Sequence, residues 1–268
     1  FTEQVDPFQR HLYFQSKTLK ENGRLDEALI SLKQALSISG TGDTAGQVLH
    51  MIRDINVRQS GPPDLALLND IIQNDPSDVV AIYSRGLEYL TQGRFEDAQK
   101  DIDEAYKLGL KVHEVRANQA YVQFMTYSPF STEGQQAYRD LEAAVAEKPQ
   151  DALFRTYLAE MQQARADIAL QQNWRVEHIG MYRVAILPSD WDRADGVSAC
   201  ISVYEQANSN LDEAIDIAPD LGLAYLVRSK IFLSLGLHDS ALDALSSSVG
   251  SSLPTAAHYL ERAAIFDF

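Results

Sequence analysis

Six histidines and a single cysteine are the side chains of this sequence best suited to metal binding or nucleophilic catalysis. No pair of histidines has the spacing of two ligands on one helix, and Glu177 and His178 are neighbours that point to different helix faces. The one cysteine, Cys200, allows neither an intrachain disulfide nor a multi-cysteine metal site. Because its sequence neighbours are apolar, we expect Cys200 to be a small residue of the core rather than a reactive thiol.

Two motifs that would point to catalysis or nucleotide binding are missing. The sequence has no Gly-x-Ser-x-Gly nucleophile elbow. The segment Gly40-Thr41-Gly42 lacks both the Lys-Ser/Thr pair and the preceding strand of a phosphate-binding loop. We therefore expect a protein that catalyses no reaction and requires neither a cofactor nor a metal.

The charge of the chain limits the classes of partner. The sequence has 23 Lys and Arg against 38 Asp and Glu, a net charge of −15, which makes nucleic acid and anionic lipid poor partners. Residues 1–60 are neutral, so the excess of acidic residues lies in the remainder. No apolar run is long enough to span a membrane. The chain begins with Phe1 rather than Met, which leaves open an extracytoplasmic location after removal of a signal or an anchor.

A recurring pattern of small and apolar residues organises the sequence. After a turn glycine comes an Ala, then an apolar residue four positions later and a small residue three positions after that, as in Ala98, Ile102 and Ala105. These offsets lie on one helix face, and the small residues let a second helix approach closely. The preceding helix carries a bulky set at matching offsets, so each unit is a helix hairpin of about 34 residues. We expect Ala98 and Ala241 to be buried between paired helices.

These residues resemble the tetratricopeptide repeat, most clearly over Ile82–Ala105 and Tyr225–Leu245. The resemblance implies an all-α fold, a right-handed α-solenoid of about six hairpins in a single repeat domain over residues 1–268, whose first helices line a groove for peptides or proteins. It also implies that the acidic clusters Asp101–Glu104 and Asp212-Glu213 lie on outer helices as a solvated surface. The expected units are 7–42, 43–76, 77–110, 111–149, 150–219 and 220–250, followed by a capping helix over 254–266.

The fifth unit is too long for one repeat. Ala207 lies 70 positions after Ala137, where one repeat gives about 34. The excess, residues 170–206, contains the aromatic and basic residues typical of interaction hot spots. We expect this insertion to be ordered and mostly helical, and to form an interface with a partner or with a second copy of the chain. The alternative is that it only seals a lengthened hairpin. Its candidate residues are Trp174, Tyr182, Arg183 and Trp191.

The groove is the principal candidate site. Its expected inward residues are basic and aromatic in the first two units and apolar or amide-bearing in the next two. Basic groups in an acidic protein favour a partner with acidic or C-terminal carboxylate groups. The alternative is that the apolar members pack against neighbouring helices. The candidates are Arg10, Tyr13, Phe14, Lys17, His50, Arg53, Tyr83, Leu87, Asn118 and Val122.

The carboxylate clamp of chaperone-binding members of the family is incomplete in this chain. The matching positions hold Tyr13, Lys17, His50, Val80 and Ser84 in place of the Lys and Asn set. The sequence therefore predicts a non-catalytic scaffold or adaptor for a protein or peptide. The alternatives are an accessory domain of a larger enzyme or secretion system and a small-ligand binding protein.

Overall fold

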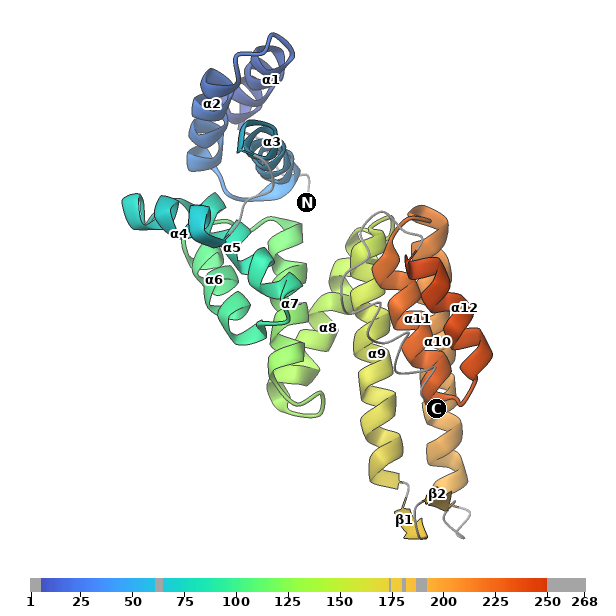
Figure 1. Ribbon diagram of the computed structural model, residues 1–268. Helices are drawn as coiled ribbons and strands as arrows, with labels where there is room; N and C mark the ends of the chain where they lie inside the picture. The colour runs from blue at the N-terminus through green and yellow to red at the C-terminus, as the bar shows by residue number, and fades with distance from the viewer. Residues whose placement is uncertain (1–5, 61–64, 174, 180–181, 187–191, 250–268) are drawn as a thin grey trace. The chain divides into compact units, whose positions relative to one another are not determined.

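The computed structural model describes residues 6–60, 65–173, 175–179, 182–186 and 192–249, and the chain forms two compact units (Figure 1). The first unit spans residues 1–127 and the second spans residues 128–268. The first contains α1 Pro7–Glu21, α2 Leu25–Ile38, α3 Gly42–Ser60, α4 Leu65–Asn74, α5 Val79–Thr91, α6 Phe95–Lys107 and α7 His113–Thr126. The second contains α8 Thr132–Glu147, α9 Ala152–Asn173, β1 Arg175–Ile179, β2 Tyr182–Ile186, α10 Asp192–Ile217, α11 Gly222–Ser234 and α12 His238–Val249.

The turn glycines of the repeat pattern form the tight hairpin connections. Gly23, Gly93 and Gly236 have φ of 75°, 71° and 74°, a conformation that side chains with a Cβ rarely adopt. At Gly93 the backbone N–H donates to Leu90 O at 3.0 Å and the next N–H, of Arg94, donates to Tyr89 O at 2.9 Å. These bonds satisfy the last carbonyls of α5 and turn the chain directly into α6.

The small residues lie where the paired helices approach most closely. Ala98 and Ala241 are fully buried, which confirms the expectation from the sequence. A Cβ added to Gly86 of α5 would lie 3.0 Å from Ile102 Cγ1 and 3.2 Å from Asp101 Cβ, so only glycine fits the crossing with α6 without a shift of its neighbours.

The second predicted hairpin does not form in the expected way. The helix α3 packs on α2 and also contacts α1, α5 and α7, whereas α4 packs on α5 (Figure 1). The loops after α2 and α6 lie against each other: Lys111 N–H donates to Gly40 O at 2.7 Å. A Cβ on Gly40 would lie 2.0 Å from Gly109 O, so a side chain there would clash with the backbone. These loops hold α3 next to α7.

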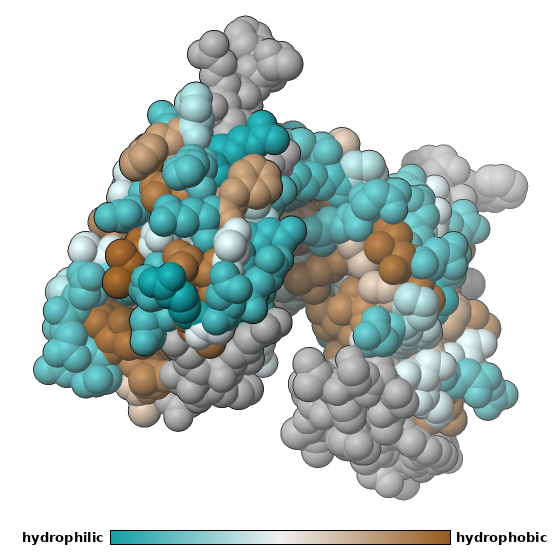
Figure 2. Space-filling view, turned by 90° about the horizontal axis from the view of Figure 1, so that it is seen from above, coloured by the Kyte–Doolittle hydropathy of each residue, from teal (hydrophilic) through white to brown (hydrophobic). Residues whose placement is uncertain are grey.

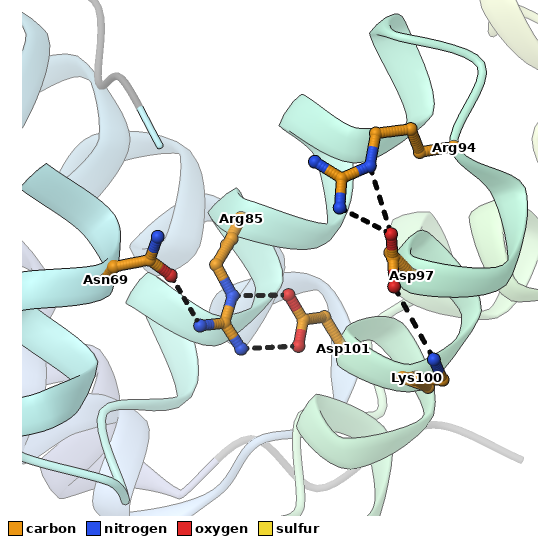
Figure 3. Close-up of polar contacts among 6 residues, drawn as sticks. All are labelled: Asn69, Arg85, Arg94, Asp97, Lys100 and Asp101. Atoms are coloured by element: carbon orange, nitrogen blue, oxygen red, sulfur yellow. Dashed lines mark hydrogen bonds and ion pairs between the residues drawn. The ribbon is translucent and has the colours of Figure 1, made fainter. Parts of the chain in front are cut away.

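An ionic cluster ties α4, α5 and α6 together (Figure 3). The Arg85 guanidinium donates two hydrogen bonds to the Asp101 carboxylate, at 2.7 and 2.8 Å, and a third to Asn69 Oδ1 at 2.8 Å. Asp101 is only 7% exposed, so the expected solvated surface is wrong at this position, although Glu104 is exposed. The hydrogen bonds that Arg85 donates to the Asp101 carboxylate raise the pKa of Arg85 above its ordinary value.

The lengthened fifth unit is built around an antiparallel pair of long helices. The helix α9 has 22 residues and α10 has 26, and small residues such as Ala159 and Ala207 are fully buried in the cluster between them. Between these helices β1 and β2 form an antiparallel hairpin, in which Arg175 pairs with Ile186 and Ile179 with Tyr182. The expectation of a mostly helical insertion is therefore wrong over these strands. The predicted capping helix, 254–266, lies outside the described residues.

Candidate partner-binding site

Four of the residues expected in the groove of the first unit lie around one carboxylate, that of Glu114. Arg53 Nη1 donates to Glu114 Oε1 at 2.9 Å, and Tyr83 Oη donates to the same atom at 3.0 Å. Asn118 Nδ2 in turn donates to Tyr83 Oη at 2.8 Å, and also to the Glu114 carbonyl at 3.0 Å. The helices α3, α5 and α7 each contribute to this centre.

Burial determines the protonation of this centre. Tyr83 is fully buried. Desolvation first, and then the Glu114 carboxylate, raise the pKa of Tyr83 well above its ordinary value. The phenol therefore stays protonated at neutral pH and acts as the donor to Glu114 Oε1.

Two acceptor atoms of the centre are buried without a hydrogen bond. They are Glu114 Oε2 and Asn118 Oδ1. His50 Nε2 lies 3.1 Å from Glu114 Oε2 without forming a hydrogen bond, so this contact becomes an ion pair only when His50 is protonated. Unsatisfied buried acceptors are costly, and they mark a place where additional donors would be stabilising.

The same contacts close the expected groove at its third and fourth units. Tyr83, Asn118 and Val122 are buried, and Leu87 is half-buried. In this arrangement of the chain the first three are covered side chains, and Tyr83 and Val122 pack in the core cluster of the first unit. Sequence reasoning missed Glu114, although its place in the first turn of α7 was a signal, because an acidic residue there is stabilised by the helix dipole.

The face of α1 is open, in contrast. Phe14 is 51% exposed, with Tyr13 edge-on to it at 5.5 Å between ring centroids and the Arg10 guanidinium 5.7 Å from the ring centroid. Lys17, one turn further along, is exposed. We call these four residues the α1 face. Figure 2, seen from above the view of Figure 1, shows hydrophobic side chains reaching the surface between hydrophilic ones.

The cations of the first unit divide into paired and unpaired ones. Arg53 pairs with Glu114, and Lys20 Nζ lies 2.5 Å from Asp54 Oδ2. Arg10 and Lys17 form no ion pair with any other residue that the structure describes. Lys111, in the loop after α6, also has no ion pair among the described residues, but its Nζ lies 5.2 Å from the centroid of the Tyr106 ring. The α1 face therefore brings two cations without an ion-pair partner together on one helix.

The comparisons with known proteins agree with this repeat architecture. The sequence profile of the tetratricopeptide repeat matches residues 12–41, which include most of α1 and all of α2. The match identifies one tetratricopeptide repeat in this stretch of the chain. No curated protein is significantly similar to the sequence.

Solved structures with tetratricopeptide repeats are similar at low identity. A tetratricopeptide repeat protein from Parabacteroides merdae is 14% identical with a TM-score of 0.44, over 97% of this chain and 100% of that one. The protein TTC0263 from Thermus thermophilus is 14% identical with a TM-score of 0.46, again over 97% and 100%. The human IFIT1 dimer with m7Gppp-AAAA is 14% identical with a TM-score of 0.50, over 88% of this chain and 48% of that one.

The insertion contains the remaining predicted site residues. Tyr182 and Arg183 are consecutive residues of β2, paired with Ile179 and His178 of β1. Trp174 and Trp191 lie outside the described residues. An interface of the insertion with a partner or with a second copy of the chain therefore stays a prediction.

The cysteine and the possible metal ligands considered in the sequence can now be placed in the structure. Cys200 is buried, and burial raises the pKa of its thiol. Within the described part of the chain, no group of three or more His, Cys, Asp and Glu side chains could hold a metal ion. None of the helices described is both long and apolar enough to cross a membrane.

Proposed function

We propose that this tetratricopeptide repeat protein is a non-catalytic scaffold that binds a protein or peptide through the α1 face. The observation that carries the proposal is the exposure of Phe14 beside two cations that have no ion-pair partner among the described residues. A large aromatic ring next to Arg is a composition typical of binding hot spots. Covering the exposed half of the Phe14 ring contributes about 2 kcal/mol, from about 25 cal/mol per Å² of apolar surface.

The partner that fits this face carries acidic or C-terminal carboxylate groups next to an apolar side chain. Arg10 offers a planar donor array for a carboxylate, and Lys17 offers a second charge two turns further along α1. The chain as a whole has a net charge of −15, which repels polyanions. We therefore favour a protein ligand over an RNA such as the one held in the human IFIT1 structure.

Affinity capture with matched variants tests this proposal. The baits are the full chain, Phe14→Ala, Lys17→Glu and the control Ile30→Ala, and the captured proteins are quantified by mass spectrometry. Ile30 is 61% exposed but lies on α2, outside the α1 face, so Ile30→Ala removes a comparable exposed apolar side chain. The specific partner should be lost with Phe14→Ala and with Lys17→Glu, and kept with Ile30→Ala.

Salt dependence separates the electrostatic part of the proposal from the apolar part. Binding of the captured partner to the wild type should weaken as salt rises, and Lys17→Glu should flatten that dependence. Equal capture by Phe14→Ala, Lys17→Glu and the wild type would exclude the α1 face as the site.

A further inference from the structure

The helix α3 covers the face of α5 and α7 that a groove of this family would leave open. We call Val80 and Tyr83 of α5, with Val115, Asn118 and Val122 of α7, the α5–α7 face. The four of these that are hydrophobic share one buried cluster with Leu49, Ile52 and Ile55 of α3. Arg53 of α3 completes the contact through its ion pair with Glu114. The chain thus seats one of its own helices on this face, with an apolar stripe and one cation.

The helices α3 and α4 do not pack against each other as the two helices of a regular hairpin do. In the other hairpins, α1 packs on α2, α5 on α6 and α11 on α12, each helix against the next one in the sequence. The helix α4 packs on α5, as α2 packs on α3 and α6 on α7, but it lacks the contact with α3. As a result only Leu68 of α4 is buried and Leu65 and Ile71 are half-buried, while Ile72, also half-buried, packs against the core cluster of the first unit. An apolar strip of α4 therefore remains for a helix to pack on.

The fit of α3 to the α5–α7 face is incomplete at its polar end. Glu114 takes one hydrogen bond from Arg53 and none at its second carboxylate oxygen, and Asn118 Oδ1 accepts none. A helix that presented an Arg in bidentate geometry to Glu114 would use both oxygens. Such a helix would bind this face better than α3 does.

We propose that the α5–α7 face is a helix-binding groove, that α3 is its built-in occupant, and that a partner helix with an apolar stripe and an Arg opposite Glu114 replaces α3. The released α3 packs on the apolar strip of α4 and so forms the regular second hairpin. This groove is separate from the α1 face, and the proposal does not depend on what binds there. The chemistry of the partner follows from that of the helix it replaces.

Fluorescein-labelled peptides with the α3 sequence, residues 42–60, are the probe. The wild-type peptide, a His50→Arg peptide and an Arg53→Glu peptide are titrated by fluorescence anisotropy against two full-length chains. One chain is the wild type, and the other carries Arg53→Glu, which places a carboxylate opposite Glu114 and releases α3. Circular dichroism checks that both chains have the same helix content.

The Arg53→Glu chain should bind the wild-type peptide at least about tenfold more tightly than the wild-type chain does, because its own α3 no longer competes. The His50→Arg peptide should bind tighter still, and the Arg53→Glu peptide should bind weakest. Equal affinity of the two chains for the wild-type peptide, or equal affinity of one chain for the three peptides, would overturn the proposal.

Amide hydrogen exchange on the wild-type chain keeps the test decisive even where the Arg53→Glu chain loses helix content. Excess His50→Arg peptide should speed exchange in α3 and slow it in α4, because α3 moves from one face to the other. Unchanged exchange in both helices at the highest soluble concentration of that peptide would show that α3 is a permanent part of the core, and would overturn the proposal.

Discussion

The substitution Asp101→Asn tests whether the ionic cluster between α4, α5 and α6 stabilises the first unit. Asp101 accepts two hydrogen bonds from Arg85, at 2.7 and 2.8 Å, and is almost completely buried, whereas the Arg85 side chain is 22% exposed. Asparagine keeps the volume and one acceptor but loses the charge and one of the two bonds. Removing one partner from a fully buried pair costs about 3–5 kcal/mol, and an exposed pair is worth about 0–1 kcal/mol. Since water reaches part of Arg85, we expect a loss of about 2 kcal/mol.

The exposed pair in the same hairpin supplies the matched control (Figure 3). Asp97 accepts two hydrogen bonds from Arg94, at 3.0 and 2.6 Å, and both side chains are well exposed. The assay is urea unfolding followed by circular dichroism. With a slope of about 2 kcal/mol per molar urea, Asp101→Asn should lower the midpoint by about 1 M. Asp97→Asn should leave it nearly unchanged. Equal shifts for the two variants would refute the distinction between buried and exposed pairs drawn here.

Three further predictions concern packing and the Glu114 centre. Ala98→Leu should destabilise the first unit by about 1–3 kcal/mol through overpacking, measured as a lower urea midpoint, because Ala98 is fully buried between α5 and α6. A double-mutant cycle of Arg53→Ala and Glu114→Ala should give a coupling energy of about 1 kcal/mol, and a value of zero would show that the 2.9 Å contact contributes nothing. Because the pKa of Tyr83 is raised in the folded state, its protonated form contributes stability that is lost as pH rises above about 10, the ordinary value. In urea unfolding at several alkaline pH values, Tyr83→Phe should therefore lose less stability than the wild type.

The parts of the fold that the sequence predicted depend on local chemistry. The turn glycines need positive φ, and the small residues four and seven positions apart fall on one helix face, so the hairpins around Gly23, Gly93 and Gly236 follow from short-range pattern. The same pattern cannot say which neighbour a helix chooses. Gly40 against Gly109, and α3 against α7 instead of α4, are contacts between residues far apart in the sequence.

The sequence of the insertion contains a β-hairpin pattern that was interpreted as helical. Its two strands are five residues each, and the register pair Ile179 and Tyr182 leaves Gly180-Met181 between them. Two short runs rich in Val, Ile and Tyr around a Gly-containing pair are typical of a β-hairpin, but the apolar spacing over Val176–Leu187 also fits a helix. Short apolar runs are ambiguous between the two, and the hairpin signal outweighs the helical one here.

The candidate site was predicted in its composition but not in its arrangement. On α1, Arg10, Phe14 and Lys17 are exposed and Tyr13 is half-buried against the core cluster, and their role in partner binding stays a prediction. Tyr83 and Asn118 are buried against Glu114 and α3, which no property of the individual repeats indicates. The number of unpaired cations in the first two repeats is smaller than the sequence suggested, because Arg53 and Lys20 form ion pairs with carboxylates on neighbouring helices.

Hydroxyl-radical footprinting with mass spectrometry measures most directly which faces of the first unit are open. The account predicts that Phe14 on the α1 face is oxidised rapidly in the native chain and that Tyr83 on the α5–α7 face is protected until the unit unfolds. Rapid oxidation of Tyr83 together with protection of Phe14 in the native chain would contradict it, because the open and covered faces would then be reversed.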